Sequence, residues 1–428
     1  MRGRRVLSRL PFGSAKHPGV LLRIFILILL AEVIAPAAPL PHEAYVWQRA
    51  WTPAVGDALA QHATNFQRIV VLAAEVTWKN KQPQITRVAL DHAALRSCKR
   101  DVGIALRIGP SSGPFHSNDA IAFTLTALAR SVIAEARMNG FSISELQLDF
   151  DCAESKLDGY RVWAEAIRRS VSPTPLVITT LPSWLRQPAF AKLVAATDGY
   201  VLQVHSLERP RSFDAPFTLC DPIAARRAVE TAGKLSTPFR VALPTYGYVV
   251  AFDAKDRFIG LAADGPSIEW PPGTRTREVR ANPAEMATLV AYWNTNRPAV
   301  MSGVIWYRLS ITQEQLNWRF RTLGVVMRGR VPQADLKVES RSSEPELQEV
   351  FLRNEGSADF QSEVSVHARI HGARVIASDA LGEFGLGKTA GDSISFRASQ
   401  LFLRAGEERK IGWFRTIKKA EVELEITK

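Results

Sequence analysis

Three polar residues alternate with apolar ones in the short segment Leu146–Asp151. Successive side chains of a β-strand point to opposite faces, so Gln147, Asp149 and Asp151 would share one face of a strand here. Two neighbouring carboxyls resist joint ionisation, which raises the pKa of one and makes it a candidate proton donor. The segment therefore predicts two catalytic carboxyls, Asp149 and Asp151, with the amide of Gln147 beside them.

Polar and aromatic residues also stand at or near the ends of other β-type segments. These are Glu75, Arg107, Gln203, His205, Tyr246, Trp306 and Arg308. Aromatic faces stack on the C–H surfaces of sugars, and carboxylates protonate a leaving oxygen or stabilise developing positive charge. Together these residues predict a substrate-binding cleft for a glycan. The structural alternatives are an ion pair between Glu75 and Arg107 and a core position for His205.

A metal site is a weaker interpretation of the same acids. Asp149, Asp151, Glu75 and His205 could supply hard ligands for a divalent ion. However, no His-x-His or His-x-x-x-His spacing accompanies them. We therefore expect neither a metal nor another cofactor.

The elements that must position these residues follow a regular alternation of β-type and helix-type segments. Eight β-type segments are rich in Val, Ile and Leu on both faces, as parallel strands covered by helices are. They are 45–51, 68–77, 102–108, 146–151, 176–181, 200–205, 240–246 and 303–309. The pattern predicts a (β/α)8 TIM barrel over residues 39–330, with its site at the carboxyl ends of the strands. An open doubly wound sheet would need a Gly-rich nucleotide-binding turn, which the sequence lacks.

Two further features flank the barrel pattern. Segments 249–252 and 257–261 predict a β-hairpin, which would form one wall of the barrel mouth. Short strands separated by turn residues fill positions 334–428 and predict a small all-β sandwich that serves as an accessory domain. Cys98, Cys152 and Cys220 allow at most one disulfide, and we expect either one bridge or buried thiols.

Residues 1–38 predict a signal peptide. A basic stretch precedes the apolar segment 24–31, which is too short to span a bilayer, and the small-residue stretch 35–38 follows. We expect a periplasmic or secreted protein with no stable membrane span after cleavage; an uncleaved anchor is the alternative. The first 38 residues hold six basic side chains and one acidic one, so the formal net charge of +12 falls to +7 without them. No Lys/Arg block is present, and we expect no nucleic-acid partner.

Three motifs resemble those of family 18 glycoside hydrolases, the chitinases and their relatives. Segment 146–151 resembles that family's strand-four signature D-G-x-D-x-D-x-E, with Asp151 at the place of the catalytic acid, Asp149 at the preceding Asp and Gln147 at the first inward Asp. Leu243–Gly247 is similar to its strand-seven L-P-x-Y-G, and Gly303–Trp306 to its strand-eight segment that ends in a Trp under the cleaved sugar. Residues 148–152, Leu-Asp-Phe-Asp-Cys, also resemble an uncharacterised bacterial family of glycosidase-like proteins, domain of unknown function 3142.

The sequence departs from the chitinase pattern at two places. Asp151 replaces the terminal Glu, and a register shifted by one step puts Ala153 there with Glu154 just beyond. His205-Ser206 replaces the strand-six aromatic-plus-Asp pair that steadies the substrate's acetamido nucleophile in that family.

The resemblance implies an exported glycoside-hydrolase-like protein acting on a polysaccharide or glycan, with N-acetylated glycans among the candidates. Asp151 would be the general acid and Asp149 would tune its pKa. Glu75, Gln203 and His205 would orient substrate or water, and Tyr246 and Trp306 would form the sugar platform. The alternative is a non-catalytic glycan-binding barrel that keeps the cleft without the chemistry.

Overall fold

The protein is described by a computed structural model that covers residues 39–80, 82–264, 268–387 and 391–428. The expected signal peptide, residues 1–38, lies outside the described residues. All the helices and strands below belong to one compact unit, Leu40–Lys428. Among the described residues, no helix has the length and apolar composition needed to cross a membrane.

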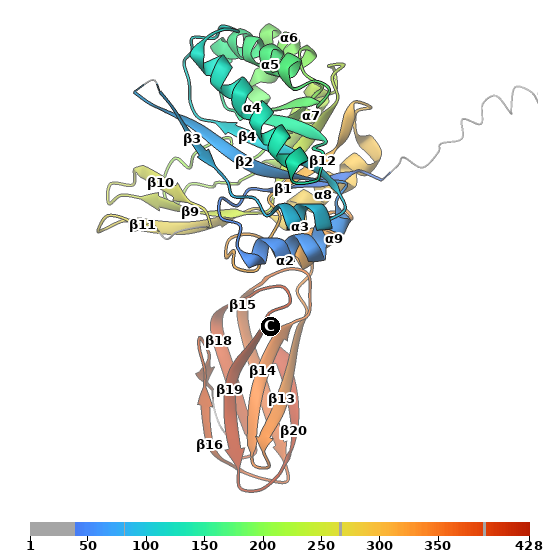
Figure 1. Cartoon of the computed structure of the whole chain (residues 1–428). Helices are drawn as coiled ribbons and strands as arrows, with labels where there is room; N and C mark the ends of the chain where they lie inside the picture. The colour runs from blue at the N-terminus through green and yellow to red at the C-terminus, as the bar shows by residue number, and fades with distance from the viewer. Residues whose placement is uncertain (1–38, 81, 265–267, 388–390) are drawn as a thin grey trace, which may run out of the picture. The chain divides into compact units, whose positions relative to one another are not determined.

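Eight parallel strands close into a barrel, as the alternation in the sequence predicts (Figure 1). In spatial order the sheet runs β1, β12, β8, β7, β6, β5, β4, β2, and pairing of β1 with β2 closes it. The strands are β1 (His42–Val46), β2 (Arg68–Lys79), β4 (Asp101–Ile108), β5 (Glu145–Phe150), β6 (Leu176–Thr180), β7 (Gly199–Gln203), β8 (Phe239–Pro244) and β12 (Met301–Tyr307). The first strand lies earlier than expected, so Trp47 follows its end instead of standing inside it.

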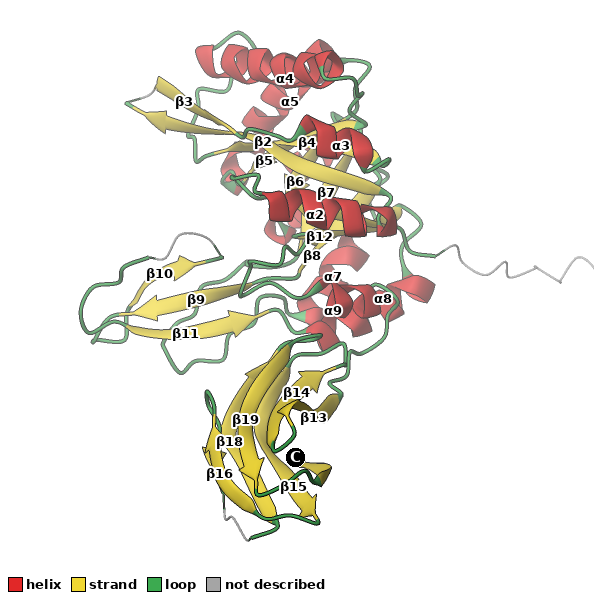
Figure 2. Cartoon of the chain, turned by 60° about the horizontal axis from the view of Figure 1, so that its bottom comes forward, coloured by secondary structure: helices red, strands yellow, loops and turns green. Residues whose placement is uncertain are grey.

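Helices connect the strands and cover the outside of the barrel (Figure 2). They are α2 (Pro53–His62), α3 (His92–Ser97), α4 (Ala120–Met138), α5 (Leu157–Val171), α6 (Pro188–Ala195), α7 (Pro222–Ala232), α8 (Pro283–Asn296) and α9 (Phe320–Val326), with the 3-10 helices η1 (Ala63–Asn65), η2 (Glu154–Lys156) and η3 (Pro182–Arg186). Local signals set several starts. The Asp119 carboxylate caps α4 by accepting a hydrogen bond from the Ala122 backbone N–H. Pro188, Pro222 and Pro283 stand at the first turns of α6, α7 and α8.

Side-chain alternation divides the buried residues into two clusters. Outward residues of the strands, such as Leu146, Leu148 and Phe150, pack against the helices in the main core. A smaller cluster of inward residues, including Tyr45, Val70 and Ile305, fills the barrel itself. The inward face of β5 therefore carries Glu145, Gln147 and Asp149, as the alternation in the sequence predicts.

Two antiparallel additions extend the barrel. β3 (Gln82–Arg87) folds back on β2 as a hairpin. Between β8 and α8 the chain forms a three-stranded sheet of β9 (Gly247–Phe252), β10 (Phe258–Ala262) and β11 (Arg275–Arg280), with β9 in the middle. The expected hairpin is present in this sheet, and β11 is an additional strand.

The carboxyl-terminal part is all β, as expected (Figure 1). One four-stranded sheet runs β13-β14-β19-β16 and the other β17-β18-β15-β20, and apolar residues of both sheets share one buried core. The strands are β13 (Leu336–Glu344), β14 (Leu347–Asn354), β15 (Phe360–His371), β16 (Val375–Ala380), β17 (Gly385–Leu386), β18 (Ser393–Leu403), β19 (Glu408–Thr416) and β20 (Glu421–Thr427). β16 and β17 were not expected from the sequence. The expected boundaries at 330 and 334 remain predictions.

Candidate active site

A cavity of about 180 Å³ lies at the carboxyl ends of the barrel strands, where barrel enzymes hold their sites. Its lining divides into a polar side and an aromatic side. The polar side holds Arg107, Asp149, Asp151, Thr179, Gln203 and Ser206, and the aromatic side holds Tyr45, Trp47, His205, Tyr246, Tyr248 and Tyr307, with Val201 and Ala242 between them. The cavity is small beside the roughly 300–1,000 Å³ of typical ligand pockets, so it can hold only a small ligand or one unit of a larger one.

Asp149 is the buried member of the carboxyl pair. It is the inward residue at the carboxyl end of β5, and its Oδ1 accepts a hydrogen bond of 2.7 Å from the Thr179 hydroxyl. An Arg107 guanidinium nitrogen lies 3.8 Å from its Oδ2. Burial raises the pKa of Asp149, against the opposing effects of Arg107 and of the Thr179 hydrogen bond. The environment thus favours a neutral Asp149 carboxyl more than water does.

Asp151 is the open member of the pair. It follows the end of β5, where the residue is exposed to solvent although its carboxyl lines the cavity. No hydrogen bond or ion pair of this side chain occurs within the described part of the chain. Burial among the cavity walls and the neighbouring Asp149 carboxyl raise the pKa of Asp151 to about 6, while Arg107 opposes the shift. An accessible carboxyl with this pKa can carry a proton to a substrate near neutral pH.

Glu75 and Arg107 lie side by side with Asp149 across three strands. The register pairs Glu75 of β2 with Arg107 of β4, and Arg107 with Asp149 of β5. The Glu75 carboxylate accepts two hydrogen bonds from Arg49, at 2.6 and 2.8 Å, and lies 3.9 Å from Arg107. The hydrogen bonds from Arg49 hold the pKa of Glu75 below its ordinary value. Glu75 is therefore a paired carboxylate beside the cavity and does not line it.

The aromatic side of the cavity surrounds a neutral histidine. The His205 ring stacks on Tyr307 at 5.6 Å, and its Nδ1 lies 3.2 Å from the Tyr246 hydroxyl, within hydrogen-bond distance. Burial lowers the pKa of His205 to about 3, so the ring is uncharged at neutral pH. Tyr246 in turn packs edge-on against Tyr248 and Tyr307. These rings offer an apolar wall with hydroxyl groups, which suits a sugar face.

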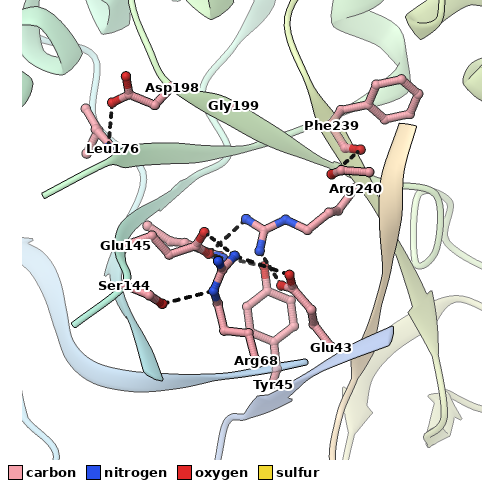
Figure 3. Close-up of polar contacts among 12 residues, drawn as sticks. Glu43, Tyr45, Arg68, Ser144, Glu145, Leu176, Asp198, Gly199, Phe239 and Arg240 are labelled. Carbon is pink, nitrogen blue, oxygen red and sulfur yellow. Dashed lines mark hydrogen bonds and ion pairs between the residues drawn. The ribbon is translucent and has the colours of Figure 1, made fainter. Parts of the chain in front are cut away.

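Beneath the cavity, at the amino-terminal ends of the strands, four charged side chains fill the barrel floor: Glu43, Arg68, Glu145 and Arg240 (Figure 3). Arg68 donates to Glu145 at 2.7 Å and to Glu43 at 3.2 Å. Arg240 donates to Glu145 at 2.8 Å and to Glu43 as well. Gly103 provides the space for this group, because a Cβ there would lie 3.0 Å from the Glu145 side chain. We name these four residues the charged floor.

Gln147 connects the charged floor to the cavity. Its amide nitrogen donates to Glu145 at 2.5 Å, and its amide oxygen accepts from the Tyr45 hydroxyl at 2.7 Å. Gln147 itself is fully buried and does not line the cavity, in contrast to the expected substrate contact. Its position makes it a support for Tyr45, which does line the cavity.

Two more expected site residues, Trp306 and Arg308, do not line this cavity. Trp306 points outward into the helix-covered core, where its indole N–H donates to His42 at 3.2 Å. A strand exposes alternate residues to the barrel interior, so Tyr307 and not Trp306 reaches the cavity. Arg308 forms an ion pair of 2.5 Å with the buried Glu314 and does not line the cavity.

The cavity brings together six expected residues, Arg107, Asp149, Asp151, Gln203, His205 and Tyr246. The sequence analysis missed Tyr45, Thr179, Ser206 and Tyr248, and it did not assign Trp47 and Tyr307 to the site. A usable signal existed for Tyr45 and Trp47, because they continue the inward alternation that starts at Glu43. Cys98, Cys152 and Cys220 are buried free thiols that lie outside the cavity lining.

With the geometry described, the chain can be compared with known proteins. Residues 117–312 match the model of the family described as Domain of unknown function (DUF3142). This match confirms the resemblance carried by the Leu-Asp-Phe-Asp-Cys stretch. Residues 337–417 match a second model, Domain of unknown function (DUF8456). A search of curated proteins finds no match.

Several solved structures are similar to this chain. The spore cortex-lytic enzyme SleL of Bacillus cereus is 10% identical, with 68% of this chain and 74% of that chain covered and a TM-score of 0.48. A chitinase from Bacteroides thetaiotaomicron is 15% identical, with 68% and 96% covered and a TM-score of 0.47. A chitinase from Chromobacterium violaceum is also 15% identical, with 68% and 98% covered and a TM-score of 0.45.

Proposed function

We propose that this protein hydrolyses a glycosidic bond of a polysaccharide or glycan at the barrel mouth, with Asp151 as the general acid. The observation that carries the proposal is the carboxyl pair that ends β5. One carboxyl is buried and held by Thr179, and the other is accessible, without a hydrogen-bond partner among the described residues, and has a pKa of about 6.

The chemistry follows from these positions. Asp151 would donate its proton to the glycosidic oxygen while the bond from that oxygen to the anomeric carbon breaks. Water supplies the hydroxyl group for the anomeric carbon, and its remaining proton restores Asp151. Asp149 raises the proton affinity of Asp151 through its charge and is fixed in place by Thr179. In its ionised form it could also steady positive charge on the sugar ring.

The aromatic side of the cavity would bind the sugar. Tyr246 and Tyr307 can take the apolar face of one sugar ring, and Gln203 can hydrogen-bond its hydroxyl groups. Tyr307 takes over the role that the sequence assigned to Trp306. A neutral His205 would orient the Tyr246 hydroxyl through the contact between them.

Replacing Asp151 by Asn tests the proposal directly. The purified wild-type protein should release reducing ends from at least one member of a panel of polysaccharides and oligosaccharides. The variant should lose activity on that glycan by about 10²–10⁴-fold, the usual contribution of a positioned general acid. Its binding of the glycan and its thermal unfolding should stay close to wild type, because the side chain is accessible and unpaired.

Glu154→Gln is the matched control for this experiment. Glu154 is the acid favoured by the shifted register of the motif, but it accepts a hydrogen bond from Gln187 and does not line the cavity. Retention of activity in Asp151→Asn, or an equal loss in Glu154→Gln, would contradict the assignment of the acid.

Two observations favour a second candidate, a glycan-binding barrel without catalysis. Asp151 is shorter than the Glu of the resembling motif, and no described residue orients its carboxyl by a hydrogen bond. If the wild-type protein binds a glycan of the panel but cleaves none of them, the binding function replaces the hydrolase.

Export remains part of the proposal, because residues 1–38 have the pattern of a signal peptide. We expect the protein outside the cytoplasm, in the periplasm or secreted. Cell fractionation, with sequencing of the mature amino terminus, tests this; an uncleaved terminus in the membrane fraction would indicate the anchor instead.

A further inference from the structure

Arg107 is the cation that lines the cavity, and its guanidinium forms no hydrogen bond within the described ranges of the chain. It lies 3.8 Å from Asp149 and 3.9 Å from Glu75, which are ion-pair distances beyond normal hydrogen-bond length. The side chain is 42% exposed. Its N–H groups, which have a fixed fork geometry, are therefore available at the cavity mouth.

The two acidic neighbours have other partners. Glu75 already accepts a pair of hydrogen bonds from Arg49, and Asp149 accepts one from Thr179. Burial also raises the pKa of Asp149, and a carboxyl that is protonated more readily attracts the Arg107 guanidinium less strongly. Neither carboxyl therefore occupies the hydrogen-bonding edge of Arg107.

Arg107 also faces the wall that would hold a sugar. In the closed order of eight strands, β4 lies opposite β8, whose carboxyl end leads to Tyr246 and Tyr248. A ring placed against these tyrosines would present its substituents toward Arg107 and the two aspartates. A guanidinium matches a carboxylate with two parallel N–H···O bonds, which gives both affinity and orientation.

We propose that Arg107 binds the carboxylate of an acidic sugar residue, so that the cavity selects a uronate-bearing glycan over its neutral counterpart. This inference rests on the proposed function only in taking the cavity as a glycan site. It does not require that the glycan be cleaved.

The charge of the chain agrees with an anionic glycan. Without the first 38 residues the formal net charge is +7, and the sequence contains no Lys/Arg block of the nucleic-acid-binding kind. A net positive protein attracts a polyanion over distances of about a Debye length, roughly 8–10 Å at ordinary ionic strength. At short range, Arg107 would then bind the carboxylate of the sugar directly.

The experiment compares matched ligands on matched variants. Calorimetry measures the binding of oligosaccharides from hyaluronan, polygalacturonate and alginate, and of the same compounds with their carboxyl groups reduced to alcohols. The Asp151→Asn protein serves as the background, so that no ligand is consumed. We expect at least one acidic oligosaccharide to bind about tenfold or more tightly than its reduced form.

Two substitutions of Arg107 and one control separate recognition from folding. Arg107→Gln should remove the preference, and Arg107→Lys should leave part of it, because charge remains without the fork. Arg130→Gln removes an exposed arginine on α4, away from the cavity, and should keep the full preference. Should Arg107→Gln fail to fold, Arg107→Lys tests the same contact: a reduced preference for the acidic ligand supports the inference, and an unchanged preference overturns it.

The inference is overturned if no acidic oligosaccharide binds better than its reduced form, or if the preference survives in Arg107→Gln. A preference for acidic ligands without cleavage of any glycan would leave the inference standing and remove the hydrolase. Cleavage of neutral and acidic glycans with equal kcat/KM would support the hydrolase and overturn the inference.

Discussion

The two ends of the barrel interior carry similar acidic and basic side chains. Those at one end are hydrogen-bonded to one another, and those at the other end are not fully paired. At the amino-terminal end, two glutamates and two arginines of the charged floor are hydrogen-bonded to one another, and all but the half-buried Arg68 are buried. At the carboxyl-terminal end, Asp151 is unpaired among the described residues and Arg107 makes only long ion pairs. Both ends are built from the same strands. In β5, Glu145 belongs to the floor and Asp149 to the mouth.

The difference separates stability from chemistry. A buried charge is tolerated when opposite charges and hydrogen bonds surround it, as in the floor, and removal of one partner leaves the others uncompensated. At the mouth, Asp151 has a raised pKa and no hydrogen-bond partner among the described residues, and Arg107 has free hydrogen-bonding capacity, which a substrate can use. We therefore expect substitutions in the floor to change folding and substitutions at the mouth to change function.

The largest effect should come from Glu145→Gln compared with Asp149→Asn on the same face of β5. Loss of the Glu145 charge leaves Arg68 and Arg240 short of a carboxylate, so the free energy of unfolding should fall by about 3–5 kcal/mol. Asp149→Asn should not destabilise the protein at pH 7 and should stabilise it. Guanidinium chloride unfolding of the two variants and wild type measures both changes.

The sign for Asp149 follows from its raised pKa. A carboxyl that holds its proton more tightly in the folded state reduces stability once the pH rises above its ordinary value of 3.8. The advantage of Asp149→Asn should therefore grow above that pH and vanish below it. An equal loss of stability in both variants would break the contrast between floor and mouth.

A smaller effect should distinguish the two neighbouring aromatic residues of β12. Tyr307→Ala removes a wall of the cavity and should weaken glycan binding about tenfold. Trp306→Phe acts in the helix-side core, so it should leave binding within about twofold of wild type while lowering the free energy of unfolding by roughly 1–3 kcal/mol. Titration calorimetry and thermal unfolding check the two readouts, and the opposite pattern would restore Trp306 to the site.

The smallest effect is a displacement of the pH profile. With a pKa of about 6, Asp151 must be protonated to act as an acid, so kcat/KM should fall as pH rises above 6. Asp149→Asn removes a negative neighbour and should move this limb to lower pH, whereas Arg107→Gln should move it to higher pH. Residual kcat/KM against pH, or carbon NMR titration of the Asp151 carboxyl, measures the shifts. If both variants moved the falling limb of the pH profile in the same direction, that limb would report the titration of a group other than Asp151.

Much of the fold could be predicted because strands buried on both faces have long apolar segments. The core strands β2, β4 and β5 begin and end within two residues of the expected bounds. The hairpin strand β3, with the sequence QPQITR, was missed because its residues are mostly exposed and have no apolar period. Only its pairing with the extended end of β2 makes it a strand.

The candidate site was predicted in part for the same reason. Alternation along β5 is a local property, so the shared face of Gln147 and Asp149 follows from the sequence alone. The choice between Trp306 and Tyr307 depends on which of two neighbouring residues faces the barrel interior. A shift of one residue along the strand turns every side chain to the opposite face. The motif resemblance favoured Trp306, while closure of the barrel puts Tyr307 in the cavity.

The sequence by itself determined the alternation of strands and helices and the acidic inward face of β5, because both depend on neighbours within a few residues. The tertiary structure decided which charges are compensated. Arg240 meets Glu43 across 197 positions of the chain, and this contact forms only when β1 and β8 enter the same closed barrel. The same closure leaves Arg107 and Asp151 facing the cavity without full partners, since no strand end of the described chain brings them a complementary charge at hydrogen-bond distance.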